Sequence, residues 1–259
     1  MSGGFRALRI LILLIILAVV ALDTGLTRLR STDWRDSLRI VVYPINADGS
    51  SVSADYIHTL KTQMFADIVE FVDTESRKYG IDVREPIDIK LAAPVVSQPP
   101  DPPKSGMLAA IVWSLKMRYW AWNNDDFNGP APEARIFVRY YDPATHRSLP
   151  HSVGIKEGLI GLVNAYASSD MSGSNDVVIL HEILHTLGAT DKYDPVTNMP
   201  IYPNGYADLS RQPSFPQDKA EIMAGRIPLS ESEAVIPRGL YQVIIGDATA
   251  GEIGWMTKE

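Results

Sequence analysis

The stretch that decides the fold runs from Asp176 to Asp191 and reads DVVILHEILHTLGATD. Its large aliphatic residues are Val177, Val178, Ile179, Leu180, Ile183, Leu184 and Leu187. On a helix these residues face nearly every side, and a helix of that kind is normally buried in the interior. The sequence therefore predicts a central, buried helix over residues 176–187.

The same helix carries His181, Glu182 and His185 in an H-E-x-x-H pattern. Side chains at i and i+4 lie on one helix face, about 6 Å apart, so both imidazoles can reach one tetrahedral ion. Glu182 is displaced from that face and can reach a water in the open coordination position, where a general base must stand. Two ordinary core histidines beside a glutamate would instead leave costly polar groups without partners. We therefore expect a metal site with Glu182 as the catalytic base.

The residues that follow extend the pattern. Gly188 can adopt positive φ without a Cβ penalty, so the helix can end there and the chain can turn back. The full stretch, H-E-x-x-H-x-x-G-x-x-D from His181 to Asp191, resembles the metzincin clan of zinc endopeptidases, in the variant with an aspartate as third ligand, as in snapalysin-like enzymes. The resemblance implies Zn²⁺ held by His181, His185 and Asp191.

The resemblance has three further implications. A tight turn below the zinc should carry a methionine, for which Met223 in Glu221–Gly225 is the first candidate and Met199 the second. An edge strand just before the active helix should pair with an extended peptide, and residues 162–167 match that place. The loop between Asp191 and Met223 contains Tyr193, Tyr202 and Tyr206, which are available to the metal or an oxyanion, although a structural role is the stronger expectation for each.

The third ligand has a second candidate. In gluzincin-like peptidases it is a distant glutamate on another helix, and Glu221 is the residue available for that role. Gly188 and Asp191 would then have no function. The remaining histidines, His58, His146 and His151, have no spacing partner and are expected to be surface or structural, with His151 the one considered for the cleft.

The rest of the chain predicts an α/β or α+β domain. Strands are expected over 38–45, 87–93, 135–141 and 158–167, and amphipathic helices over 54–79 and 107–122. In the second helix the predicted core stripe is Leu108, Ile111, Val112, Leu115, Tyr119 and Trp122, and Trp113 and Trp120 are expected to pack rather than bind a ligand. The resemblance implies a twisted mixed sheet, a long active-site helix and a small C-terminal subdomain after the glycine turn.

The N-terminal residues predict a targeting segment. Arg6 and Arg9 precede the apolar run 10–22, so residues 1–23 are interpreted as an uncleaved signal anchor and residues 24–37 as a stalk. The catalytic domain then covers 38–259, with subdomains 38–188 and 189–259. It is expected outside the cytoplasm, membrane-anchored, or secreted if the segment is cleaved.

Composition limits the chemistry. The formal net charge of −7 argues against nucleic acid or an anionic membrane surface as the main partner, and the absence of cysteine excludes thiolate ligands and nucleophiles. Together with the H-E-x-x-H pattern, the resemblance implies a zinc metalloendopeptidase acting on a peptide or protein substrate. The alternative is a membrane-anchored zinc-binding protein that recognises peptides without cleaving them, but retention of Glu182 favours the enzyme.

Overall fold

The computed structural model describes residues 33–103, 105–156 and 158–256. The predicted anchor, residues 1–23, and most of the predicted stalk lie outside these ranges. Within the described ranges, no helix combines the length and the apolar character needed to cross a bilayer.

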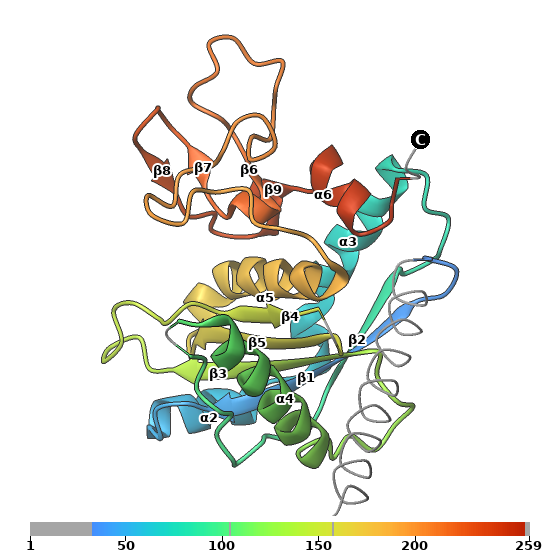
Figure 1. Ribbon diagram of the computed structural model, residues 1–259, viewed down its shortest axis with the longest axis vertical. Coiled ribbons are helices and arrows are strands. Elements are labelled where there is room, and N and C mark those ends of the chain that lie inside the picture. Colours follow the sequence, from blue (N-terminus) through green and yellow to red (C-terminus); the bar gives the residue numbers. More distant parts are fainter. Residues whose placement is uncertain (1–32, 104, 157, 257–259) are drawn as a thin grey trace, which may run out of the picture.

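A five-stranded sheet forms the centre of the molecule (Figure 1). Its strand order is β2-β1-β3-β5-β4. Four strands are parallel: β1 (Leu38–Asn46), β2 (Ile87–Leu91), β3 (Ala134–Tyr141) and β5 (Ile160–Tyr166). The short strand β4 (Val153–Ile155) runs antiparallel beside β5. The predicted α/β class and the four predicted strands are confirmed, with small shifts at their ends.

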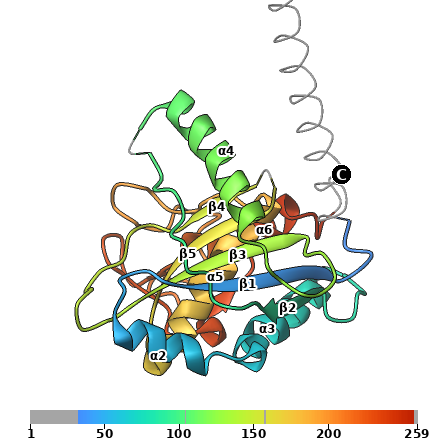
Figure 2. The same ribbon diagram turned by 90° about the horizontal axis from the view of Figure 1, so that it is seen from below.

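Helices cover both faces of this sheet (Figures 1 and 2). On one face lie α2 (Ser51–Thr59), α3 (Ala66–Lys78) and α5 (Ser172–Leu187), and on the other α4 (Met107–Asn123). Successive strand residues point to opposite faces. Ile40 and Val42 therefore join the core with α3 and α5, whereas Val41 and Tyr43 join the core with α4.

The predicted single helix over 54–79 is wrong. Its first part, α2, is capped by Ser50, whose Oγ accepts the Ser53 N–H at 3.0 Å, and ends at Leu60 in an extended conformation. A 3-10 turn, Thr62–Phe65, leads into α3. Met64, which lies in this turn, is exposed. Both helices bury residues in the same core, so apolar residues recur at spacings of three and four across the break. The sequence pattern therefore did not reveal the break.

The predicted face of α4 is also wrong. The buried residues are Trp113, Met117 and Ala121, and the predicted stripe faces outward. Nearly every position of α4 is apolar, so spacing alone cannot say which side meets the sheet. Trp113 and Trp120 pack as expected: their Nε1–H groups donate to Pro100 O at 2.8 Å and Ser97 Oγ at 3.0 Å.

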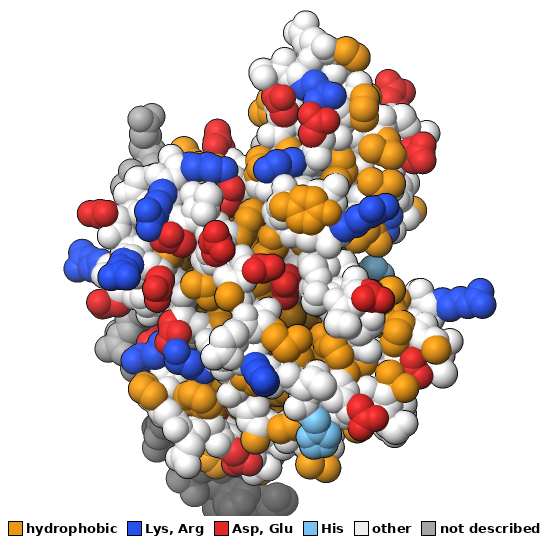
Figure 3. Space-filling model, turned by 180° about the vertical axis from the view of Figure 1, so that it is seen from behind, with side chains coloured by type: hydrophobic (Ala, Val, Ile, Leu, Met, Phe, Trp, Pro, Cys, Tyr) orange, Lys and Arg blue, Asp and Glu red, His pale blue; other side chains and the backbone are white. Residues whose placement is uncertain are grey.

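The C-terminal part, called the C-terminal lobe, is small and built from short elements, and its outer part projects from the body of the molecule beside a notch (Figure 3). These elements are β6 (Ala220–Glu221), β7 (Ile227–Pro228), β8 (Ala234–Val235), β9 (Val243–Ile244), α6 (Asp247–Glu252) and the 3-10 turns Ile222–Ala224 and Leu240–Gln242. A further 3-10 turn, Ser169–Met171, precedes α5.

The predicted stalk ends earlier than residue 37. Trp34 is buried, packs edge-on against Trp255 and donates its Nε1–H to Ile253 O at 2.8 Å. These contacts tie the start of the described chain to its C-terminal end. The folded domain therefore includes Trp34.

Candidate metal centre

Helix α5 brings the predicted site residues together. It lies between the sheet and the C-terminal lobe (Figure 1) and ends at Gly188, whose φ of 109° is left-handed and suits glycine. One ligand atom from each of His181, Glu182 and His185 lies within 4.8 Å of the others. The helix starts one turn earlier than predicted and ends at the predicted residue.

Backbone carbonyls fix the orientation of both imidazoles. His181 Nδ1–H donates to Ile222 O at 2.9 Å, and His185 Nδ1–H donates to Ala189 O at 2.9 Å. A carbonyl oxygen can only accept, so Nδ1 carries the proton in each ring. In the neutral imidazoles Nε2 therefore presents a lone pair to the site, which is the arrangement found around metal-binding histidines.

Asp191 lies opposite these lone pairs. Its Oδ1 is 3.2 Å from His181 Nε2 and 3.1 Å from His185 Nε2. Three acceptor atoms at these separations repel one another unless a cation lies among them or extra protons bridge them. Burial lowers the pKa of His181, but the carboxylates of Asp191 and Glu182 outweigh this effect and raise it. Both imidazoles hold the pKa of Asp191 well below its usual range.

The donor set fits zinc. Ligands of a tetrahedral zinc ion, each about 2.0–2.1 Å from the metal, are about 3.3 Å apart, close to the two separations of Asp191 Oδ1. Two nitrogens and one carboxylate oxygen also match the three-ligand sets of catalytic zinc sites. Glu182 supplies an independent sign, because its Oε2 is buried without a hydrogen-bond partner. Burial raises the pKa of Glu182, against the lowering effect of the neighbouring histidines.

Glu221, the alternative third ligand, lies elsewhere. Its Oε2 accepts the N–H groups of Met223 and Ala224 at 2.7 and 3.1 Å, and its Oε1 accepts from Gly246 N–H and Thr249 Oγ1 at 3.2 and 2.6 Å. These contacts hold the turn that follows it. The structure thus brings Asp191, and not Glu221, to the imidazoles.

The turn Glu221–Gly225 packs against α5. It closes with Gly225 in the left-handed region at φ 67°, and it supplies the Ile222 carbonyl that orients His181. Met223 is fully buried and accepts the Lys192 N–H on its backbone oxygen at 2.9 Å. Met199, the second candidate, is half-buried in the loop after Asp191, where its oxygen accepts the Asp194 N–H.

A cavity of about 450 Å³ opens over the site and is lined from both subdomains. Of the three tyrosines considered, Tyr193 lines it, and burial together with Asp191 raises the Tyr193 pKa. Tyr202 and Tyr206 instead pack edge-on against each other in the outer loop. His151 also lines the cavity, although its spacing from the other histidines predicted no partner. Its only sequence signal was its position shortly before the strand that leads to α5.

The prediction that residues 162–167 form the edge strand is wrong. Residues 162–166 lie inside the sheet, because β4 folds back through a turn and pairs with β5, and β4 is the outer strand. Gly154 of β4 lies so close to α5 that a Cβ there would be 2.4 Å from His185 Cβ. Only glycine lets this strand run beside the site. The sequence did not predict β4, because a strand of three residues shows no periodicity.

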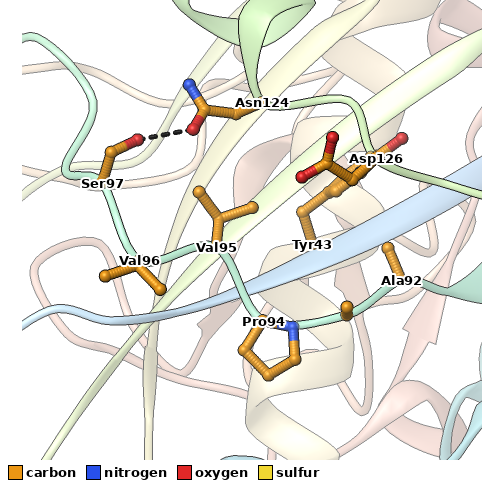
Figure 4. Close-up of a pocket in the computed structure, with 9 residues that line it drawn as sticks. Tyr43, Ala92, Pro94, Val95, Val96, Ser97, Asn124 and Asp126 are labelled. Carbon is orange, nitrogen blue, oxygen red and sulfur yellow. Dashed lines mark hydrogen bonds between the residues drawn. The ribbon is translucent and has the colours of Figure 1, made fainter.

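Another cavity, of about 350 Å³, lies on the α4 side of the sheet (Figure 4). Tyr43, the segment 92–97, Asn124 and Asp126 line it, and Ser97 Oγ donates to Asn124 Oδ1 at 2.6 Å. The lining holds one carboxylate and no histidine, so it does not offer a comparable ligand set.

No protein-family model matches the chain, and no curated protein is significantly similar to it. The function of the protein is therefore inferred from the geometry of the site.

Proposed function

We propose that this protein is a zinc-dependent peptidase in which His181, His185 and Asp191 hold the metal and Glu182 is the general base. The observation that carries the proposal is the convergence of three ligand atoms beside a buried carboxylate oxygen without a partner. A purely structural zinc site would normally close its fourth position and would need no base. The resemblance to the metzincin clan over His181–Asp191 supports the same proposal.

When bound, zinc supplies a Lewis acid that polarises the scissile carbonyl and makes water more acidic. Glu182 Oε2 is a free acceptor in the same cavity, so it can take a proton from the attacking water and pass it to the leaving amine. The C–N bond breaks as the water oxygen bonds to the carbonyl carbon. The products are a carboxylate and an amine.

Strand β4 is the candidate platform for the substrate. Val153 and Gly154 line the cavity, and the outer side of β4 is the edge of the sheet. An extended peptide can add to such an edge through main-chain hydrogen bonds, which hold it without reading every side chain. We propose a peptide or protein substrate on this basis, and membrane attachment on the basis of the apolar run 10–22.

The test is metal content and hydrolysis of an unfolded protein substrate, measured on the purified full-length chain in detergent. The variants are Asp191→Ala, Glu182→Gln, Glu221→Gln and, as an exposed carboxylate control, Asp218→Ala. We expect one zinc per chain in the wild type and in all variants except Asp191→Ala. Hydrolysis should survive in Glu221→Gln and Asp218→Ala, and should fall by about 10²–10⁴ in Glu182→Gln.

Other results would redirect the assignment. Zinc without hydrolysis in the wild type would favour a peptide-recognition protein. Loss of zinc in Glu221→Gln, with retention in Asp191→Ala, would replace the proposed ligand set. A wild-type chain that binds no metal would overturn both functions.

A further inference from the structure

Helix α4 presents an apolar surface that no described residue covers. The exposed residues are Met107, Leu108, Ile111, Val112, Leu115, Tyr119 and Trp122, and this set is called the α4 face. Leu108 is 75% exposed and Trp122 is 71% exposed. In Figure 2 the first turns of α4 extend clear of the body of the molecule. Soluble proteins rarely leave contiguous apolar patches of this kind without a binding partner.

The polar residues of α4 suit a lipid surface. Its only ionisable side chains, apart from Tyr119, are Lys116 and Arg118, and both are cationic in a chain with a formal net charge of −7. The ring centroids of Tyr119 and Trp122 are 6.0 Å apart. Tyrosine and tryptophan are the residue types enriched at the membrane–water boundary. Helices that lie in the interface combine aromatic and aliphatic residues with lysine and arginine in this way.

The place where the described chain begins supports the same partner. Arg118 lies beside Gly158, which precedes β5. Because β1, β3 and β5 are parallel, the first residues of β5 and of β1 lie at the same end of the sheet. The apolar run 10–22 precedes β1 in the sequence by a short segment. Residues 23–32 can span at most about 35 Å. A bilayer that held the apolar run would therefore lie within about that distance of the start of the described chain.

We propose that the α4 face inserts into the interface of a bilayer with anionic headgroups, as a second membrane contact beside the N-terminal segment. This contact does not depend on metal binding or hydrolysis. A symmetric pairing of two α4 helices fits less well, because it would bring the cations of both copies together with no acidic residue on either helix. Held at two points, the domain would keep a fixed orientation to the membrane.

The absence of cysteine makes a direct test possible, because a single introduced cysteine is the only labelling site. The full-length chain carries Ile111→Cys or, as a matched control, Ile236→Cys in the C-terminal lobe; these isoleucines are 52% and 59% exposed. Each variant is labelled with an environment-sensitive fluorophore and reconstituted in vesicles of phosphatidylcholine and phosphatidylglycerol. Quenching by nitroxides on the lipid chains is compared with quenching by aqueous iodide.

We expect the label at residue 111 to shift to shorter wavelength, to be quenched by lipid nitroxides and to show a several-fold lower iodide quenching constant than the label at residue 236. Leu115→Cys, one turn further along the same face, should behave like Ile111→Cys. Equal access of iodide to residues 111 and 236 would overturn the proposal. Protection from iodide without lipid quenching would also overturn it. Disulfide-linked dimers of the unlabelled Ile111→Cys protein under oxidising conditions would then identify a second copy as the partner, and their absence would indicate the chain's own N-terminal segment.

Discussion

Helices α4 and α5 are both apolar on nearly every side, yet they occupy opposite environments. Helix α5 lies between the sheet and the C-terminal lobe, and most of its residues are buried. Helix α4 covers the other face of the sheet, and only Trp113, Met117 and Ala121 are buried. An apolar helix is therefore interior only if the fold provides a layer on each of its sides, which depends on segments far away in the chain.

The polar residues of the two helices differ in the same way. On α5 the imidazoles and Glu182 converge on one cavity, and distant carbonyls of Ile222 and Ala189 hold the rings. On α4 the charged residue Lys116 is exposed to solvent. Burial on α5 thus fixes functional groups in place, whereas the α4 face remains available to a partner.

The largest expected contrast is in unfolding free energy. Leu180, on α5, is fully buried, so Leu180→Ala should lower the free energy of unfolding by about 2–5 kcal/mol through lost transfer energy and a residual cavity. Leu108→Ala makes the same chemical change on the exposed face of α4 and should stay within about 0.5 kcal/mol. Urea unfolding of the full-length chain in detergent measures both. Equal costs for the two variants would contradict the different burial of the helices.

The fold was predictable where local patterns decide it. The strand over 135–141 is specified by its β-branched and aromatic residues, and the end of the helix at Gly188 by a glycine in the left-handed conformation. The break at Leu60 and the burial of Met117 were not predictable, because they depend on which core each side chain reaches. Strand β4 was missed because three residues carry no periodicity, and it exists only through its pairing with β5.

The candidate site was predictable for a related reason. His181, Glu182, His185, Gly188 and Asp191 lie within one helix and the turn after it, so spacing alone brings them close. The long-range parts were less accessible. The Ile222 carbonyl that orients His181 comes from 41 residues further along, and His151 reaches the cavity from a loop with no pattern.

The second contrast concerns a buried ionisable group of α5. Burial, with the nearby carboxylate of Asp67, raises the pKa of Asp176 to about 7. The folded state then binds a proton more tightly than the unfolded state, whose pKa is about 3.9, so stability falls as pH rises from about 4 to about 7. Asp176→Asn removes this penalty. The variant should gain about 2–4 kcal/mol over wild type at pH 8 and almost nothing at pH 4.

Urea midpoints at the two pH values check this prediction, with Asp55→Asn on the exposed side of α2 as the control. The control should show no comparable pH-dependent gain. If Asp176→Asn destabilised the protein at pH 8, the carboxylate would be stabilised by a partner or by the N-terminus of α5, and its burial would not be a cost.

The third contrast concerns how closely a neighbour approaches the helix. Gly154→Ala would place a Cβ 2.4 Å from His185 Cβ on α5, and the shift of β4 that this requires should cost about 1–3 kcal/mol. The rate of hydrolysis should also fall under conditions in which the variant remains folded, because β4 lines the cavity. Gly251→Ala in α6 is the control, since its Cβ would meet no atom within 4 Å. An active, stable Gly154→Ala protein would show that β4 can move away from the site without consequence.

The smallest expected effect tests the α4 side alone. Leu115 is 51% exposed, and glutamine has nearly the same helix propensity as leucine, so Leu115→Gln removes apolar surface without disturbing the helix. If no part of the protein covers the α4 face, the free energy of unfolding in detergent should change by less than about 0.5 kcal/mol. If another segment of the chain packed there, the amide would be buried without partners at a cost of about 1–3 kcal/mol. A small change of the free energy of unfolding in detergent, together with weaker lipid quenching at residue 111 in vesicles, would show that the membrane covers the α4 face and that no other part of the protein does.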